Sequence, residues 1–273
     1  PSYRFMLLSR DYGAILLCSD FDLTLTSDTY KYRDGDDFFA PIPKNNIAAV
    51  NEFVARGGTF AVVSGRNPDE IALLRDVMPI ADLCVCSNGT AVYSISEKRP
   101  VVSFTMGREC EKVIEYFSGF ADEYSYMRVT DGDFRFNFYR RGDDVKEFLK
   151  QPKFPVYKMI IEHADKALGE KHYEAASRLF GGEFSVEMSS WRTLEVCPEG
   201  SGKGEALKRM LPLLGKTFDK VVCVGDNQND IGMIKLADVG YAVGNSIPAL
   251  KAAATRVTVN SGEGAIAKII EEL

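Results

Sequence analysis

AILLCSDFDLTLTSD, residues 14–28, joins an unbroken apolar run to a cluster of acids and hydroxyls. The run from Ala14 to Cys18 predicts a short strand that is buried on both faces, as in a parallel sheet. Asp20 and Asp22 follow at once, where a chain that only reversed its direction would more often carry Gly, Pro or Asn. Each acid alone fits a polar turn or a helix cap. The cluster becomes informative if other strand ends carry matching chemistry.

Beyond this stretch the sequence alternates between strand and helix. Apolar runs at 59–63 and 83–86 predict two further strands, and the segments 45–54 and 68–77 predict the helices between them. Strand, helix and strand in this order form the pattern of right-handed βαβ units and a parallel sheet. The same alternation returns after Gly202.

The middle of the chain has a different pattern. Alternating and mixed segments between residues 91 and 191, interleaved with two helix-like stretches, are typical of an antiparallel α+β module. The predicted fold class is therefore α/β, with a Rossmann-like parallel-sheet core formed by residues 1–90 and 192–273. Residues 91–191 are predicted to form an α+β domain inserted into that core.

Composition and charge narrow the classes of partner. The chain has 273 residues, 45% of them hydrophobic, and a net charge of −6, which fits a globular protein with a large core. The acidic balance disfavours nucleic acid as the main partner, although one local pocket can still bind an anion. No apolar run approaches the ~20 residues of a membrane span, and no secretory leader is evident. We expect a cytoplasmic protein without membrane or nucleic-acid partners, and the oligomeric state stays open.

The six cysteines do not predict a disulfide framework. Five of them stand in or beside apolar, strand-like runs, where a free thiol packs as a small core residue. Cys84 and Cys86 lack the two-residue gap of a zinc or redox pair. Because His163 and His172 are the only histidines, a histidine-based metal centre or triad is disfavoured. Reduced thiols are expected.

Ligands of open α/β sheets bind outside the carboxyl ends of the strands. Four predicted strands end there in polar clusters, namely Asp20 with Asp22, Ser64-Gly65-Arg66, Asn88-Gly89, and Gly225 to Asp230. Asp20, Asp22 and Asp226 at one point would repel one another unless a cation lay among them. Ligands that are all oxygen suit Mg²⁺, and neither acidic loop has the Gly and Glu of an EF-hand.

Anion-binding elements accompany these acids. Ser64 and the N–H of Gly65, at a strand-to-helix turn, can donate hydrogen bonds to a phosphate. Lys203 is a cation on a glycine-rich turn into a helix, in a sequence that matches neither a P-loop nor a dinucleotide fingerprint. Acids, a metal and phosphate donors together predict phosphoryl transfer, with a carboxylate as nucleophile because no histidine is near.

Taken in order, these motifs resemble those of haloacid dehalogenase superfamily phosphatases. The subgroup is the Cof type, whose C2B-like α/β cap is inserted between the second and third motifs. The matching residues cover the two ends of the chain, and they are Asp20-Phe-Asp22-Leu-Thr24, Ser64-Gly65-Arg66, Lys203 in Ser-Gly-Lys-Gly, and Gly225-Asp226-Asn-Gln-Asn229-Asp230.

The resemblance implies a role for each of these residues. Asp20 would attack phosphorus to form an aspartyl-phosphate, and Asp22 would protonate the leaving oxygen and then deprotonate the hydrolytic water. By the same resemblance Thr24 would orient Asp22, and Asp230 would support Lys203. The phosphate would be bound by Ser64, Gly65, Lys203 and Asn229, and the leaving group would be faced by Arg66 and Asn88. Mg²⁺ would be held by Asp20, the Asp22 backbone carbonyl and Asp226.

Two features depart from the family pattern. Leu23 stands where the commonest form of the first motif has Gly, so a left-handed backbone there would be strained. The acidic segment 28–43 has no assigned role.

The expected activity is hydrolysis of a small phosphorylated metabolite, such as a sugar phosphate. A phosphoryl-transfer mutase on the same core, or a metal- or phosphate-sensing module without turnover, are the alternatives. A dehalogenase fits less well because Asp22 and the metal would have no task. The insert would close over the leaving group, and its candidate contacts are Arg128, Asp131, Arg135, Lys158 and Trp191.

Overall fold

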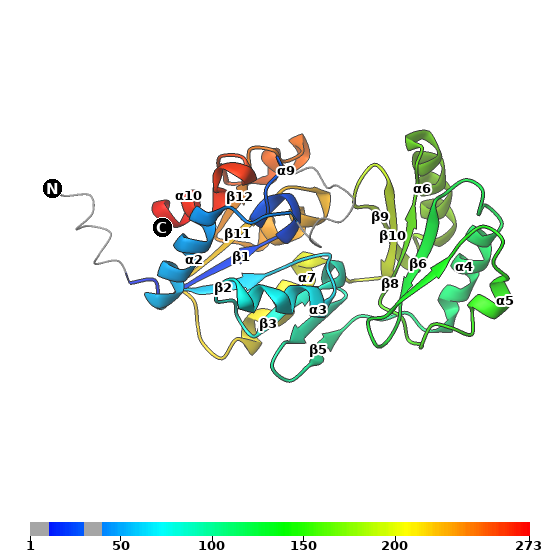
Figure 1. The fold of residues 1–273 in the computed structure, drawn as a ribbon, viewed down its shortest axis with the longest axis horizontal. Coiled ribbons are helices and arrows are strands. Elements are labelled where there is room, and N and C mark those ends of the chain that lie inside the picture. Colours follow the sequence, from blue (N-terminus) through cyan, green and yellow to red (C-terminus); the bar gives the residue numbers. More distant parts are fainter. Residues whose placement is uncertain (1–10, 30–39) are drawn as a thin grey trace.

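The structure is a computed structural model that describes residues 11–29 and 40–273. Most of the acidic segment 28–43 therefore lies outside the described residues. The chain forms two lobes, and it passes from one to the other after β5 and again after β10 (Figure 1). Among the described residues, no helix has the length and apolar character needed to span a bilayer.

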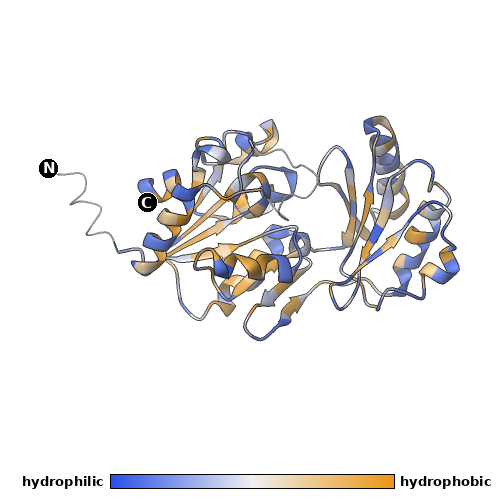
Figure 2. Ribbon diagram, in the orientation of Figure 1, coloured by the Kyte–Doolittle hydropathy of each residue, from blue (hydrophilic) through white to orange (hydrophobic). Residues whose placement is uncertain are grey.

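The first lobe is built on a sheet of five parallel strands in the order β13-β12-β11-β1-β2. The central strand β1 lies between β11 and β2, and hydrophobic residues are concentrated in these strands (Figure 2). The predicted parallel α/β core is thus confirmed. The strands are β1 (Ile15–Ser19), β2 (Thr59–Val62), β11 (Lys220–Gly225), β12 (Val239–Ala242) and β13 (Arg256–Val257).

Helices cover both faces of this sheet. On one face α2 and α10 pack in a common hydrophobic cluster with Leu17 and Val222, and on the other α7, α8 and α9 pack with Leu16 and Cys223. Alternate strand residues thus face opposite helical layers, which explains the unbroken apolar runs. The helices of this lobe are α2 (Lys44–Ala55), α3 (Pro68–Ala72), α7 (Lys203–Met210), α8 (Ile231–Leu236), α9 (Pro248–Ala253) and α10 (Ala265–Glu272).

The second lobe contains an antiparallel sheet in the order β7-β6-β8-β10-β9. Its helices cover one face only, where Met127, Met159 and Leu194 join the hydrophobic cluster. The opposite face carries the alternate residues of the same strands. The elements are α4 (Glu111–Ser118), β6 (Tyr126–Thr130), β7 (Phe136–Tyr139), α5 (Val145–Phe148), β8 (Lys158–Glu162), α6 (Lys166–Phe180), β9 (Phe184–Met188) and β10 (Thr193–Pro198).

Strand pairing supports limits of the insert that differ from the predicted 91–191. β3 (Leu83–Cys86) meets β2 through a parallel bridge between Val63 and Val85, and it then forms an antiparallel sheet with β4 (Ala91–Ser94) and β5 (Arg99–Ser103). β4 and β5 thus join the core, whereas β10 belongs to the sheet of the insert. We propose an insert of residues 104–198, with the remaining described residues as core.

All six cysteines are free and buried, in keeping with the predicted absence of disulfides.

Candidate active site

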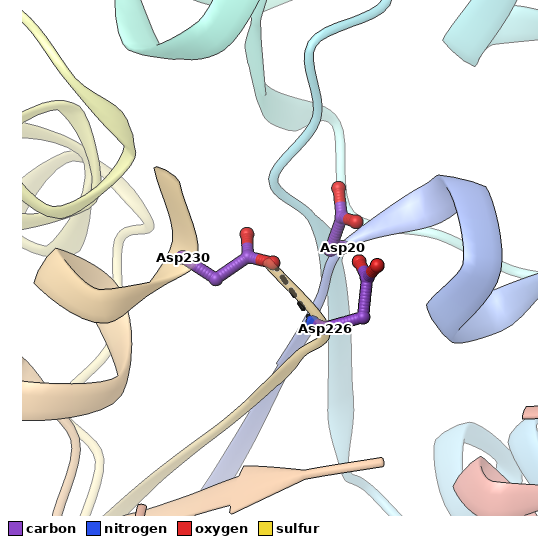
Figure 3. A group of neighbouring side chains, drawn as sticks. All are labelled: Asp20, Asp226 and Asp230. Atoms are coloured by element: carbon purple, nitrogen blue, oxygen red, sulfur yellow. Dashed lines mark hydrogen bonds between the residues drawn. The ribbon is translucent and has the colours of Figure 1, made fainter. Parts of the chain in front are cut away.

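The carboxyl ends of β1 and β11 bring three aspartates together. Ser19 is paired with Val224, so Asp20 and Asp226 leave adjacent strands side by side, and the Asp20 N–H donates to the Val224 carbonyl. Asp230 follows in the loop after β11. One carboxylate oxygen from each acid lies within 4.8 Å of the others, and all three side chains are buried (Figure 3).

Lys203 lies between two of these acids. Its Nζ donates to Oδ1 of Asp20 at 2.7 Å and to Oδ1 of Asp230 at 2.6 Å, and the residue is only 2% exposed. Lys203 is the first residue of α7, and close backbone contact fixes this helix start. A Cβ at Gly89, after β3, would lie 2.1 Å from the carbonyl carbon of Gly202. Glycine at 89 therefore permits the approach that brings Lys203 to the acids.

Asp230 also orders the loop after β11. Its Oδ2 accepts hydrogen bonds from the backbone N–H groups of Asp226 at 2.9 Å and Asn227 at 3.0 Å. The predicted contact between Asp230 and Lys203 is present, and the same carboxylate sets the position of Asp226. Because Asp230 is occupied in this way, Asp20 and Asp226 are the acids most available to a ligand.

The electrostatics of the cluster are those of excess negative charge. Burial raises the pKa of Asp20 well above its usual value, Lys203 acts against this rise, and Asp230 and Asp226 add to it. Burial and the neighbouring Asp230 raise the pKa of Asp226 to about 6. Burial disfavours the charged form of Lys203, but Asp20 and Asp230 raise its pKa overall. Three buried carboxylates and one ammonium group leave room for a further positive charge.

This donor set fits Mg²⁺. Asp20 and Asp226 offer hard oxygen ligands at the mouth of a parallel sheet, without histidine or thiol among the clustered groups. Mg²⁺ commonly takes one or two protein carboxylates and completes its shell with water and substrate phosphate. The predicted set included the Asp22 backbone carbonyl, whereas the third clustered carboxylate is that of Asp230.

Asp22 does not point into the acid cluster. Its side chain is 46% exposed, and Arg66 donates to both carboxylate oxygens, from Nε at 2.8 Å and from Nη2 at 2.7 Å. Arg66 reaches Glu70 as well, at 3.2 Å. Arg66 was predicted to face the leaving group. It does line the cavity described below, with its guanidinium turned to Asp22.

Thr24 differs from its predicted contact. Its hydroxyl donates to Oδ1 of Asp226 at 3.2 Å instead of orienting Asp22. The intervening Leu23 has φ +59° and ψ 10°, a left-handed conformation that turns the chain between the two side chains. The strain predicted for Leu is therefore built in, at roughly 1–2 kcal/mol. The hydroxyl of Thr26 accepts the Leu23 N–H at 3.1 Å.

The second motif shapes the opposite wall. Ser64 is fully buried, and its Oγ accepts the backbone N–H of Arg66 at 3.1 Å. The carbonyl of Gly65 accepts from Nζ of Lys158, in the insert, at 3.1 Å. Gly65 lies on the cavity surface, where its backbone is accessible to a ligand.

A buried polar network that the sequence did not predict joins the two lobes. Glu195 of β10 accepts from Nδ2 of Asn88 at 2.6 Å and lies 3.5 Å from Nζ of Lys158. Asn88 in turn accepts from Nδ2 of Asn229 at 2.9 Å. Asn88 and Asn229 therefore hold each other, and Oδ1 of Asn229 is buried without a partner. One feature of the sequence could have indicated Glu195: it is the single acid in the mostly apolar strand TLEVCP.

A cavity of about 770 Å³ lies between the lobes and contains Asp20, Asp22, Lys203 and Asp226 in its lining. Of the candidate residues from the insert, Arg128 and Lys158 line it. The other three do not: Asp131 is buried and accepts backbone N–H groups of the β6–β7 turn, Arg135 is exposed, and Trp191 is 51% exposed. The cavity is thus made of core residues on one side and the open face of the second sheet on the other.

Comparison with known proteins agrees with this arrangement. The sequence profile of the haloacid dehalogenase-like hydrolases matches residues 17–270. The HMP-PP phosphatase of Cronobacter sakazakii is 25% identical over 216 residues, which cover 75% of this chain and 78% of that protein. A 5-amino-6-(5-phospho-D-ribitylamino)uracil phosphatase of Bacillus subtilis is 26% identical over 147 residues, 53% of this chain. The match spans only about half, 48%, of the Bacillus protein.

A solved structure shows the same fold. The haloacid dehalogenase-like hydrolase from Bacteroides thetaiotaomicron superposes with a TM-score of 0.76 and 23% identity, over 94% of this chain and 98% of that one. The profile match covers nearly the whole described chain, including every motif residue named above. The chain therefore belongs to the haloacid dehalogenase-like hydrolase family and is a phosphatase of that family.

Proposed function

We propose that the protein is an Mg²⁺-dependent phosphatase that hydrolyses a small phosphorylated metabolite through an aspartyl-phosphate on Asp20. One observation carries the proposal: a buried carboxylate, paired with Lys203 and adjacent to Asp226, lies in the wall of a large polar cavity. A carboxylate so placed is shielded from bulk water, and an ammonium group beside it can offset the charge of an approaching phosphate.

The proposed reaction has two steps. A carboxylate oxygen of Asp20 forms a bond to phosphorus while the bond from phosphorus to the ester oxygen breaks, and Asp22 gives a proton to that oxygen. A water molecule then attacks phosphorus, Asp22 accepts its proton, and the bond to Asp20 breaks to release phosphate. Each step uses Asp22 in the opposite protonation state, so the residue acts as acid and then as base.

The other residues hold the phosphate or balance charge. Ser64, the Gly65 N–H, Lys203 and Asn229 are proposed to contact phosphate oxygens, with Asp230 holding Lys203 in place. Asp20 and Asp226 would hold Mg²⁺, which when bound neutralises charge on the transferring phosphoryl group. The Asp22 carbonyl remains a proposed third ligand. Arg66 and Asn88 are proposed to face the leaving group, once Arg66 exchanges part of its contact with Asp22 for the substrate.

The class of substrate follows from the cavity and from the relatives. A volume of about 770 Å³ accommodates a phosphorylated metabolite. The names of the relatives, an HMP-PP phosphatase and a 5-amino-6-(5-phospho-D-ribitylamino)uracil phosphatase, support a small phosphorylated molecule. A sugar phosphate stays within this class. Nucleic acid and membranes are not proposed as partners, and a cytoplasmic location stays a prediction.

Hydrolysis of p-nitrophenyl phosphate tests the proposal. The wild type should turn it over with Mg²⁺ and lose activity in EDTA, and Asp20→Asn should be inactive. Asp219→Asn is the matched control. Asp219 is exposed and lies directly before β11, at the end of this strand opposite to Asp226. Turnover in H₂¹⁸O should place one ¹⁸O atom in the released phosphate and none in the Asp20 carboxylate, because water attacks phosphorus and Asp20 keeps its own oxygens.

The alternatives give different results. A mutase would transfer the phosphoryl group to a sugar hydroxyl faster than to water, which product analysis would detect. A sensing module would leave p-nitrophenyl phosphate intact with and without Mg²⁺. Either result would contradict the proposed hydrolysis.

A further inference from the structure

Arg128 is a cation in the cavity that forms no hydrogen bond or ion pair with the described residues. It lies on β6, on the face of the second sheet opposite the hydrophobic cluster, and it is part of the cavity lining. No hydrogen bond or ion pair joins its guanidinium to any described residue, and its Nε is buried. Leaving a buried donor unpaired costs free energy, so such a group in a cavity indicates a ligand.

The other cations of the cavity are all paired. Lys203 is bound by Asp20 and Asp230, Arg66 by Asp22 and Glu70, and Lys158 faces Glu195. Arg128 is therefore the cation among the described lining residues whose donors remain available.

The carboxylates closest in the sheet are occupied elsewhere. Glu162 accepts from Thr193 at 2.8 Å and pairs with Arg192 at 3.2 Å. Glu195 is held by Asn88 and Lys158. The charge of Arg128 helps to lower the pKa of Glu195, but the oxygens of both acids are bound elsewhere, so the donors of Arg128 remain available to an anion that enters the cavity.

Phe136 holds the guanidinium in position. The Arg128 Cζ lies 4.1 Å from the centroid of the Phe136 ring, and Phe136 also lines the cavity. Contact with a ring face orients the plane of a guanidinium and leaves its N–H edge available for two parallel hydrogen bonds. An anion with two oxygens in one plane, such as a carboxylate or a phosphate, matches that edge.

The position of Arg128 fits the far end of a small substrate. Arg128 is paired with Ile160 in the sheet, two residues along β8 from Lys158, whose Nζ contacts the Gly65 carbonyl beside the proposed phosphate site. Two residues of a strand span about 7 Å. This separation is comparable to the length of a small metabolite.

We infer that Arg128 binds a second anionic group, a carboxylate or a phosphate, on the leaving group of the substrate. The inference rests on the proposed phosphatase function and deepens it: the preferred substrates are phosphomonoesters whose leaving group is itself anionic.

Three sugar phosphates with six carbons test the inference. Glucose 6-phosphate has a neutral leaving group, 6-phosphogluconate carries a carboxylate, and glucose 1,6-bisphosphate carries a second phosphate. The wild type should show its highest kcat/KM with one of the two anionic leaving groups, and which one it prefers identifies the anion. Arg128→Gln should lower that kcat/KM about 10–100-fold, as expected for loss of charge-assisted hydrogen bonds. For glucose 6-phosphate and p-nitrophenyl phosphate, the kcat/KM of Arg128→Gln should differ from that of the wild type by less than about twofold.

Arg140→Gln is the matched control. Arg140 also lies over an aromatic ring, that of Phe138 at 5.0 Å, but it is exposed and is not part of the cavity lining. The Arg140→Gln variant should have the same kcat/KM as the wild type with every substrate. Phe136→Leu should weaken the preference for the anionic leaving group, because the guanidinium loses its support. The melting temperature of Arg128→Gln should change little, since no hydrogen bond or ion pair to a described residue is removed and the lost contact with the Phe136 ring contributes only weakly to stability.

Two results would overturn the inference. One is a wild type that hydrolyses p-nitrophenyl phosphate but prefers glucose 6-phosphate; the other is an equal loss on all substrates in Arg128→Gln. An inert wild type would instead overturn the proposed phosphatase. In that case calorimetry measures the affinity of wild type and Arg128→Gln for the same sugar phosphates. This tests the role of Arg128 without turnover, and equal affinities would refute the inference.

Discussion

Arg66 holds Asp22 through two parallel hydrogen bonds, from Nε to Oδ2 at 2.8 Å and from Nη2 to Oδ1 at 2.7 Å. The pair crosses from the second strand end to the first, so the proposed acid–base residue is oriented by the motif that also lines the phosphate site. Charge-assisted bidentate pairs of this kind fix the orientation of both side chains.

The first prediction concerns Asp22 as proton donor. Asp22→Asn should reduce hydrolysis of an alkyl phosphate such as glucose 6-phosphate about 10²–10⁴-fold, the range expected for general acid catalysis. The loss with p-nitrophenyl phosphate should be smaller in the first step, because its leaving group is a weak base that needs little protonation. Single-turnover release of the alcohol or phenol measures that step. Equal losses with both substrates would contradict a proton-donor role.

The second prediction concerns Mg²⁺ and stability. An ion that binds the folded protein alone raises the free energy of unfolding by about 2.7 kcal/mol at 100 times its dissociation constant. Urea unfolding with Mg²⁺ and with EDTA should show an increment of this size for the wild type. Asp226→Asn should lose most of the increment because the buried cluster loses one of its charged ligands. The control Asp219→Asn should keep it, and an unchanged increment in Asp226→Asn would argue against this metal site.

The parallel core was predictable because its signals are local. Each strand buried on both faces is a short apolar run, and each run ends in the polar residues that form the site. The acids therefore meet for a topological reason: β1 and β11 are neighbours, and their carboxyl ends share one edge of the sheet.

The limits of the insert were less predictable. The residues of β4, β5 and β10 have patterns that suit an antiparallel sheet, and periodicity does not say which sheet a strand joins. In the structure β4 pairs with β3 and β5, and β10 pairs with β8 and β9, which supports the proposed insert of residues 104–198.

Contacts between side chains far apart in sequence escaped prediction as well. Thr24 reaches Asp226 because a left-handed Leu23 redirects the chain, and a sequence pattern does not give that direction. Glu195 meets Asn88 across 107 residues. A buried glutamate in an apolar strand signals that a partner exists, but only the fold identifies it.

The third prediction concerns the buried ion pair of Glu195 and Lys158 within the insert. Glu195 and Lys158 are 5% and 2% exposed, so neither charge is well solvated. Glu195→Gln can still accept from Asn88 but leaves the Lys158 ammonium without a countercharge. Breaking one side of a buried ion pair costs about 3–5 kcal/mol, and urea unfolding should show a loss of that order.

Glu187→Gln is the control for this variant. Glu187 is directly opposite Glu195 in the β9–β10 pairing and is exposed, so its substitution should change the unfolding free energy by less than about 0.5 kcal/mol. Similar stabilities of the two variants would show that the Lys158–Glu195 pair contributes nothing to the free energy of unfolding.

The last prediction concerns pH and the insert. His163 and His172 are buried, their rings are joined from Nε2 to Nδ1 at 2.8 Å, and burial lowers the pKa of both. Glu123 partly opposes the lowering of the His172 pKa, and Lys171, which pairs with Glu123, adds to this lowering.

In the unfolded chain both rings take up protons below about pH 6.5, while the folded protein resists protonation until lower pH. The stability that the two rings contribute should therefore be complete above pH 6.5 and decline as the pH falls, by up to about 1.4 kcal/mol per pH unit for each ring. Urea unfolding at pH 7.5 and 5.0 measures this decline, and His172→Gln should reduce it because one of the two titrating rings is gone. An identical decline in the variant would assign the pH dependence to other groups.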